Sequence, residues 1–140
     1  MLYLDTSLLI SAHSRESRTD DVLRWLSKQN VAELSISDWV ITEFSSALSI
    51  KLRMGVIGTG QRGAMLAQFT QLSVNTLRLL PIEVSALRTA ARFCDQPHLN
   101  LRAGDALHLA ICAEHGAVLC TLDQRLSQAA PLVGVGCVML

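Results

Sequence analysis

This 140-residue sequence carries no net charge, because its 12 Lys and Arg are balanced by 12 Asp and Glu. A neutral chain has no global attraction to nucleic acid or to a membrane surface. Binding of either kind would therefore need a local cluster of charge. If several acids were gathered at one site and neutralised by a metal ion, the remaining surface would be positive.

Aromatic residues are also scarce, at 4% of a chain that is 50% hydrophobic. The core must therefore be aliphatic. The length is that of one domain with enough residues to bury a core. There is no internal repeat and no low-complexity linker, so we expect a single domain over residues 1–140.

Cysteine is limited to four residues without CxxC spacing: Cys94, Cys112, Cys120 and Cys137. Their apolar neighbours favour small buried hydrophobes over a disulfide or a zinc site. No signal peptide and no apolar run of membrane length is present. We therefore expect a soluble protein in a reducing, cytoplasmic setting, without a membrane partner.

What is present is an alternation of short strands and helices. Strands are expected at 2–4, 33–37, 77–80, 118–121 and 135–139, and helices at 8–12, 20–29, 39–54, 64–72, 83–94, 101–115 and 123–130. Short strands separated by helices indicate a parallel sheet covered on both faces. The predicted fold is a three-layer α/β/α sandwich with a central, mostly parallel sheet.

Local signals predict several helix ends. Thr19 or Asp20, and Ser37 with Asp38, are candidate N-caps, and Gly55 is placed to end a helix. The segment 58–60 (GTG) predicts a turn, and it is too short and wrongly spaced for a phosphate-binding loop.

Four acids are expected at one edge of this sheet. Asp5 ends the first strand and Asp123 follows the strand at 118–121. Glu43 and Asp105 lie in the first turns of helices that follow other strands. The carboxyl ends of parallel strands and the amino ends of the following helices share one edge, where ligands bind in open α/β sheets.

Each acid also has a structural explanation. Asp5 and Asp123 could cap the next segment, and Glu43 could favour an early helical turn through the dipole. Asp105 is harder to explain, because an unpaired acid on an apolar helix face is costly to bury. Crowded carboxylates repel one another, and Mg²⁺ or Mn²⁺ removes that repulsion. Such an ion can activate water and polarise a phosphodiester.

No nucleophilic triad competes with this interpretation. Ser7 has no obvious partner histidine. His108 is the only histidine near one of the four acids, and its apolar helix favours a packing or hydrogen-bonding role over catalysis.

The motifs MLYLDTS, WVITEFSSAL, LRAGDALHLAIC and CTLDQRL resemble, in order and over the whole chain, the PIN-domain family. The closest likeness is to VapC-type ribonuclease toxins of toxin–antitoxin pairs. The resemblance implies a PIN-like fold with Asp5, Glu43, Asp105 and Asp123 as the acidic quartet. Asp5 and Asp105 would be metal ligands, and Asp123 and Glu43 would complete the site directly or through water. Thr6 or Ser7 would hold a water or a carboxylate in place.

The resemblance also implies an activity and partners. The reaction would be Mg²⁺- or Mn²⁺-dependent endonucleolytic cleavage of RNA. Such toxins form homodimers and are silenced by a small cognate antitoxin, through which they contact operator DNA. RNA binding needs positive side chains, for which the candidates are Arg15, Arg18, Arg62, Arg102 and Arg125. A partner surface could form from Met54, Val56, Ile57, Met65, Leu66 and Phe69, or these could pack inside the domain.

Three alternatives remain open from the sequence. The acids would serve a DNase equally well, because nothing here reads the 2′-OH. Phosphotransfer with Asp5 as nucleophile would resemble haloacid-dehalogenase phosphatases, but that family needs a second Asp where this chain has Ser7. A weakly active chain could also act mainly as the dimerising partner in a DNA-binding repressor complex.

Overall fold

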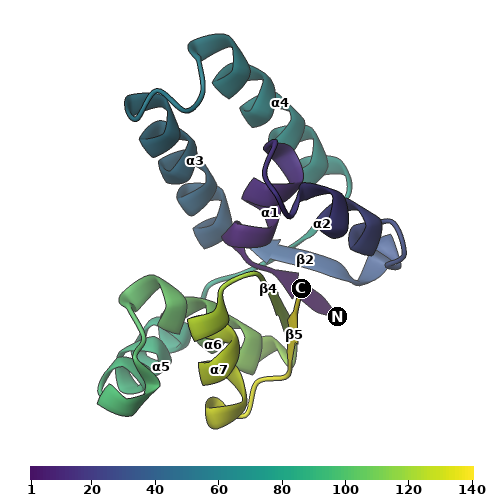
Figure 1. Ribbon diagram of the computed structural model, residues 1–140. Helices are drawn as coiled ribbons and strands as arrows, with labels where there is room; N and C mark the ends of the chain where they lie inside the picture. The colour runs from purple at the N-terminus through teal and green to yellow at the C-terminus, as the bar shows by residue number, and fades with distance from the viewer.

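The computed structural model describes residues 1–140, in which five strands and seven α-helices follow one another (Figure 1). The strands are β1 (Leu2–Leu4), β2 (Leu34–Ser37), β3 (Arg78–Leu80), β4 (Val118–Thr121) and β5 (Cys137–Met139). The helices are α1 (Thr6–His13), α2 (Thr19–Leu26), α3 (Asp38–Arg53), α4 (Thr59–Asn75), α5 (Val84–Cys94), α6 (Ala103–His115) and α7 (Gln124–Ala129). Short 3₁₀ turns cover Val31–Glu33, Pro97–Leu99 and Ala130–Val133. None of the helices combines the length and hydrophobicity needed to cross a lipid bilayer.

The strands form one sheet in the order β3-β2-β1-β4-β5, and every neighbouring pair is parallel. The first strand lies at the centre, where Leu2 is in register with Leu34 of β2 and Val118 of β4. Helices α1 to α4 lie on one side of the sheet and α5 to α7 on the other, and the α3–α4 hairpin extends away from it (Figure 1). The predicted α/β/α sandwich is therefore confirmed.

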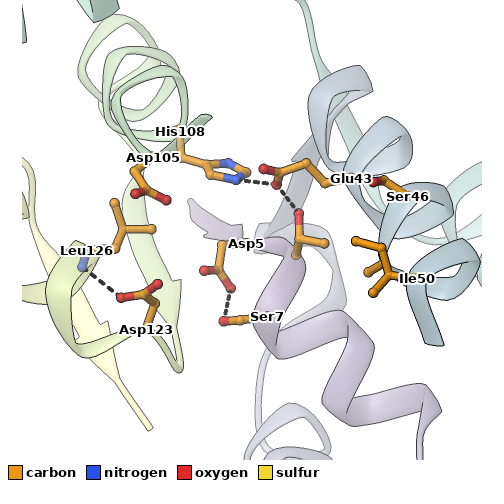
Figure 2. Close-up of a pocket in the computed structure, with 11 residues that line it drawn as sticks. Asp5, Ser7, Glu43, Ser46, Ile50, Asp105, His108, Asp123 and Leu126 are labelled. Carbon is orange, nitrogen blue, oxygen red and sulfur yellow. Dashed lines mark hydrogen bonds and ion pairs between the residues drawn. The ribbon is translucent and has the colours of Figure 1, made fainter. Parts of the chain in front are cut away.

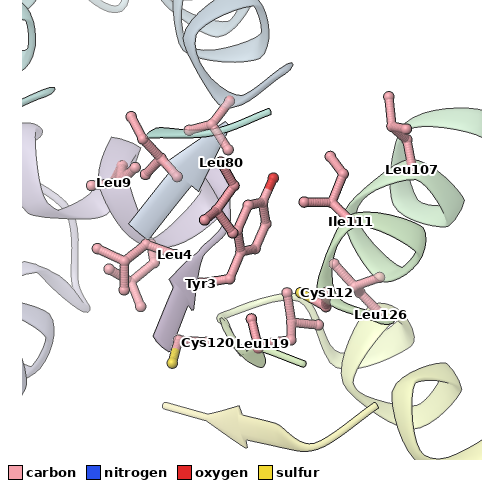
Figure 3. Close-up of a cluster of buried hydrophobic side chains, with 14 of the residues drawn as sticks. Tyr3, Leu4, Leu9, Leu80, Leu107, Ile111, Cys112, Leu119, Cys120 and Leu126 are labelled. Carbon is pink, nitrogen blue, oxygen red and sulfur yellow. The ribbon is translucent and has the colours of Figure 1, made fainter. Parts of the chain in front are cut away.

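The central strand divides the core between the two layers. Successive side chains of a strand point to opposite faces. Tyr3 points toward Ile111 and Cys112 of α6, and Leu4 lies toward Leu9 of α1 (Figure 3). The only aromatic residues among the buried hydrophobic ones are Tyr3, Phe44 and Phe69, and the core is mostly aliphatic, as the low aromatic content predicted.

Helix α4 is longer than the sequence indicated. The expected turn at 58–60 is wrong: Gly58 is the N-cap, and the helix already begins at Thr59. A glycine inside a helix costs about 0.5–1 kcal/mol relative to alanine, which made this segment read as a turn. The helix is held by packing further along, where the Phe69 ring stacks on Phe44 of α3 with centroids 4.0 Å apart.

The N-cap predicted at Thr19 or Asp20 is wrong, whereas the N-cap predicted at Ser37 is confirmed in position, although its side chain does not cap the helix. Helix α2 has Arg18 at its N-cap and no side-chain cap, because the Thr19 hydroxyl instead donates to the backbone carbonyls of Ser11 and Ser14. Ser37 occupies the N-cap of α3, but its hydroxyl lies 2.7 Å from the Tyr3 hydroxyl and not on the helix. Both hydroxyls bond residues outside the helix that each was expected to cap. Gly55 follows the end of α3 with a φ of 71°, as expected of a helix-ending glycine.

The cysteine and partner-surface expectations hold in part. Cys112 and Cys120 are buried, Cys137 is partly buried, Cys94 is exposed, and all four are free thiols. Of the six residues considered for a partner surface, Ile57, Met65 and Phe69 belong to the core, whereas Met54 and Val56 are exposed. The packing explanation therefore applies to that buried half of the set.

Candidate active site

A hollow of about 290 Å³ at the carboxyl edge of the sheet brings the predicted residues together. It is lined by all four acids, Asp5, Glu43, Asp105 and Asp123, and by both hydroxyl residues, Thr6 and Ser7. His108 and four further residues complete the lining: Ser46, Ala47, Ile50 and Leu126. The carboxylates of Asp5, Asp105 and Asp123 point toward one another, and Glu43 enters from the opposite wall (Figure 2). The juxtaposition expected from parallel-sheet geometry is therefore present.

Asp5 is the single residue between β1 and α1, and it is buried. Its Oδ1 accepts hydrogen bonds from the Ser7 hydroxyl at 2.7 Å and from the Leu8 backbone N–H at 3.1 Å, and its Oδ2 accepts from Thr121 at 2.6 Å. Burial raises the pKa of Asp5, and the nearby His108 and these hydrogen bonds only partly oppose the shift. The site thus holds a carboxylate whose charge lacks a full counterpart within the chain.

Two hydroxyls tie Asp5 to the turn after β4. Thr121 Oγ1, which donates to Asp5, accepts from the backbone N–H of Asp123 at 2.9 Å. Ser7 Oγ, which also donates to Asp5, accepts from the backbone N–H of Leu122 at 3.0 Å. The first strand and the fourth therefore hold their acids in a fixed relation, although 118 positions separate them in the numbering.

Asp105 and Asp123 each use one oxygen for helix capping. Asp123 Oδ1 accepts from the backbone N–H groups of Arg125 and Leu126 at the start of α7. Asp105 Oδ2 accepts from the Arg102 N–H at 3.3 Å. The other oxygen of each carboxylate has no hydrogen-bond partner within the chain. Capping and ligand binding are thus compatible, because capping orients each carboxylate and leaves an oxygen free.

Glu43 is held by partners on two other helices. Its Oε2 accepts from the Thr6 hydroxyl of α1 and lies 2.7 Å from His108 Nε2 of α6. Burial raises the pKa of Glu43, but the hydrogen bonds and charge of His108, with the Thr6 hydrogen bond, outweigh burial and lower the pKa below its usual value. Glu43 is therefore held as an ionised carboxylate at neutral pH.

His108 belongs to a buried chain of hydrogen bonds that the sequence does not reveal. Its Nδ1 lies 3.0 Å from the Tyr3 hydroxyl, which lies 2.7 Å from the Ser37 hydroxyl. All three residues are buried. With Glu43 ionised, Nε2 of His108 donates to it, and the hydroxyls of Tyr3 and Ser37 can turn to suit either state of Nδ1. The predicted hydrogen-bonding role of His108 is confirmed, and Glu43 is its partner.

Gly104 allows α6 to approach α3 closely at the rim of the hollow. A Cβ atom at this position would lie 3.0 Å from Glu43 Oε1 and 3.1 Å from Cζ2 of Trp39. Only glycine leaves both side chains undisturbed. The G in the motif LRAGDALHLAIC marks this contact, but sequence reasoning did not single it out.

As placed, no three His, Cys, Asp or Glu side chains are close enough together to hold a metal ion by themselves. The lining offers mainly carboxylate and hydroxyl oxygens, and hard divalent cations prefer oxygen ligands. Mg²⁺ keeps several waters and is bound through one or two carboxylates together with substrate phosphates. The donors are all oxygens, and Asp105 and Asp123 each have an oxygen with no partner in the chain. The donor set therefore fits a hard, partly hydrated cation.

Comparison with known proteins gives a family. The sequence profile described as PIN domain matches residues 2–132, whereas no curated protein sequence matches the chain. Among solved structures, FitAcB from Neisseria gonorrhoeae is similar with a TM-score of 0.74 at 14% identity, covering 98% of this chain and 96% of that chain.

Two further structures share the fold. VapBC2 from Rickettsia felis, bound to a DNA fragment from its promoter, has a TM-score of 0.70 at 16% identity and covers 100% of this chain and 99% of that one. VapC20 from Mycobacterium tuberculosis, a toxin that cleaves the sarcin-ricin loop, has a TM-score of 0.72 at 17% identity and covers 92% and 95%. At these identities the similar structures show only that the fold is shared. The family assignment comes from the sequence profile, whose match spans almost the whole chain. The chain belongs to the PIN domain family.

Proposed function

We propose that this chain is a Mg²⁺- or Mn²⁺-dependent endoribonuclease, a single nuclease domain that acts as the toxin of a toxin–antitoxin pair. The observation that carries the proposal is the convergence of Asp5, Glu43, Asp105 and Asp123 on one hollow. Four carboxylates in a shared space repel one another unless a cation accompanies them. The family match and the similarity to a toxin that cleaves the sarcin-ricin loop support RNA as the substrate.

Each side chain has a proposed task. Asp5 and Asp105 would hold the cation, and Asp123 and Glu43 would complete its surroundings directly or through water. Ser7 keeps Asp5 oriented and Thr6 keeps Glu43 oriented by the hydrogen bonds that each donates. A divalent ion bound here would supply the charge that activates water and stabilises the phosphodiester during attack.

The same comparison supports an antitoxin partner. Toxin–antitoxin complexes, some of them bound to DNA, are among the similar structures. We propose that a small cognate antitoxin binds this chain, that operator DNA is contacted only through the antitoxin, and that the chain forms a homodimer. The exposed Met54 and Val56 are available for such contacts.

RNA cleavage by the purified, partner-free chain tests the proposal. We expect total RNA to be cleaved with Mg²⁺ or Mn²⁺ and to stay intact with EDTA or with the Asp5→Asn and Asp105→Asn variants. Cleavage that survives EDTA and both substitutions would contradict the acidic-site mechanism. Cleavage of single-stranded DNA but not RNA by the same folded, metal-loaded protein would make the chain a DNase instead.

A further inference from the structure

A second hollow opens directly beside the acidic one. It measures about 450 Å³ and is lined only by polar residues: Asn100, Asp123, Gln124, Arg125 and Gln128. Asp123 lines both hollows, so the second continues from the acidic site past the start of α7. From this we infer that the second hollow binds the nucleotide next to the cleaved phosphodiester in a single-stranded RNA substrate. This inference rests on the proposed ribonuclease function and adds the residues that select its substrate.

Arg125, the one cation of the lining, indicates a phosphate ligand, beside the acid Asp123 that the two hollows share. Arg125 is partly buried and takes part in none of the five ion pairs of the chain. Its backbone N–H donates to Asp123 Oδ1 at 2.8 Å, which fixes the start of its side chain beside the acidic site. A guanidinium binds phosphate oxygens through paired donors, and RNA enzymes need such cations near an acidic centre. Among the five candidate arginines, Arg125 is the one that lines a hollow shared with the acidic site, so it is the candidate for contact with the substrate backbone.

The carboxamides indicate contact with a base. The side chains of Asn100, Gln124 and Gln128 form no hydrogen bond within the chain, so their donors and acceptors are free for a ligand. Single-stranded RNA is read through hydrogen bonds to base edges and through stacking on aromatic side chains. This lining contains no aromatic residue, and Arg125, the one planar group on which a base could stack, is assigned to the phosphate. Binding through hydrogen bonds alone discriminates between bases, whereas stacking tolerates all of them. The hollow should therefore impose a nucleotide preference.

The conformation of Asn100 fits this role. It ends the 3₁₀ turn at Pro97–Leu99 with a φ of 52°, the only positive φ among the non-glycine residues. Asparagine tolerates the left-handed region better than most residues, and a glycine here would keep the backbone while removing the amide. Asn100→Gly is consequently a clean test of the side chain.

The test compares steady-state cleavage of short oligoribonucleotides that differ only at the positions flanking the cleaved bond. We expect a weaker nucleotide preference at one flanking position in the double variant Gln124→Ala/Gln128→Ala and in Asn100→Gly. In both, KM should rise about tenfold while kcat stays within about twofold. Arg125→Gln should weaken binding to all sequences and reduce the slope of log Kd against log salt by about one.

A matched control exists on the other side of the molecule. Gln61 and Gln68 line a separate hollow together with His13 and Arg15, and none of the four acids belongs to that lining. Gln61→Ala/Gln68→Ala and the exposed Arg88→Gln should leave preference, KM and salt slope unchanged. Heat denaturation of each variant shows whether it is folded.

The two levels of the hypothesis fail differently. Absence of RNA cleavage by the folded, metal-loaded wild type would overturn the proposed function and this inference together. The inference alone would be overturned by a different result. In that case the wild type cleaves RNA with metal, but the substitutions at Asn100, Gln124, Gln128 and Arg125 leave KM, nucleotide preference and salt slope unchanged. Equal effects of the control pair Gln61→Ala/Gln68→Ala would also overturn it, because the effect would then not belong to this hollow.

Discussion

His108 and Glu43, 65 positions apart in the sequence, are joined by a hydrogen bond of 2.7 Å between Nε2 and Oε2. The second ring nitrogen of His108 faces the Tyr3 hydroxyl at 3.0 Å, so both nitrogens are engaged and the ring orientation is fixed. This contact joins α3 to α6 across the candidate active site. Glu43 is therefore positioned by a buried residue that reaches it from another helix.

Loss of the His108 imidazole should impair the site more than the fold. We expect His108→Ala to lower metal-dependent RNA cleavage by about 10- to 100-fold, the range seen when a residue that orients a metal ligand is removed. His108→Gln, which can still donate to Glu43, should recover part of the loss. The measurement is kcat/KM at saturating and limiting Mn²⁺. Full activity of His108→Ala at limiting Mn²⁺ would contradict the positioning role.

The Tyr3→Phe substitution tests the stability of the fold separately from the positioning of Glu43. It keeps the His108–Glu43 hydrogen bond but leaves the buried Ser37 hydroxyl without its Tyr3 partner. Such an unpaired buried group costs about 1–3 kcal/mol. Denaturant unfolding should show that loss, while cleavage should fall less than in His108→Ala. A variant as stable as the wild type would show that the Tyr3 hydroxyl bond contributes nothing to folding.

A methyl group on Gly104 should act on the site directly. In Gly104→Ala the new Cβ would lie 3.0 Å from Glu43 Oε1, so Glu43 and Trp39 must shift by a few tenths of an ångström. Activity is sensitive to such displacements, and we expect a loss of about tenfold. Gly63→Ala is the control, because its Cβ meets nothing within 4 Å. It should raise the free energy of unfolding by about 0.5–1 kcal/mol and leave cleavage unchanged. Equal activities of the two variants would count against the close contact.

Asp5 and Glu43 should affect stability in opposite directions as pH changes. The pKa of Asp5 is raised by burial, so the folded state binds its proton more tightly than the unfolded state does. In EDTA the contribution of Asp5 to the free energy of unfolding therefore falls as pH rises from the usual carboxyl range through the raised pKa. Asp5→Asn should consequently have a higher Tm than the wild type at neutral pH, with the difference shrinking in acid.

The Glu43→Gln substitution should change Tm at neutral pH in the opposite direction to Asp5→Asn. The pKa of Glu43 is lowered, because the hydrogen bonds and charge of His108, with the Thr6 hydrogen bond, overcome the effect of burial. Its ionised form thus stabilises the fold above the usual carboxyl pKa, and this stability is lost as pH falls through the lowered pKa. Glu43→Gln should therefore lower Tm at neutral pH. The same sign of ΔTm for both substitutions at neutral pH would contradict the assigned directions.

The thiols should differ sharply in reactivity. Cys94 is exposed, whereas Cys112 and Cys120 are buried, and burial raises the pKa of both thiols. Because the thiolate is the reactive form, iodoacetamide at neutral pH should modify Cys94 in the folded protein and reach the buried pair only on unfolding. Mass spectrometry after a short reaction measures this, and Cys94→Ser should remove the fast product. Rapid labelling of Cys112 in the folded chain would mean that α6 opens locally.

The parallel sheet and the acidic quartet could be predicted because both depend on local signals. Alternating strands and helices imply a parallel sheet, and that topology alone brings Asp5, Glu43, Asp105 and Asp123 to one edge. The partners of these acids could not be predicted, since Thr121 and His108 lie far from Asp5 and Glu43 in the sequence. The hydroxyls of Thr19 and Ser37 likewise resemble helix caps, but each bonds residues outside its own helix. The start of α4 was missed for a related reason. Its glycines resemble a turn, and the stacking of Phe69 on Phe44 that stabilises the helix is a tertiary contact.

Titration of the metal-free protein with Mn²⁺, followed by electron paramagnetic resonance of the free ion, tests most directly whether the four carboxylates form one cation site. We expect saturable binding by the wild type and affinity at least about tenfold lower in Asp5→Asn and Asp105→Asn. Asp20→Asn, which alters an exposed acid outside the hollow, should bind like the wild type. Absence of Mn²⁺ binding by the folded protein, or binding unaffected by both site substitutions, would contradict the account.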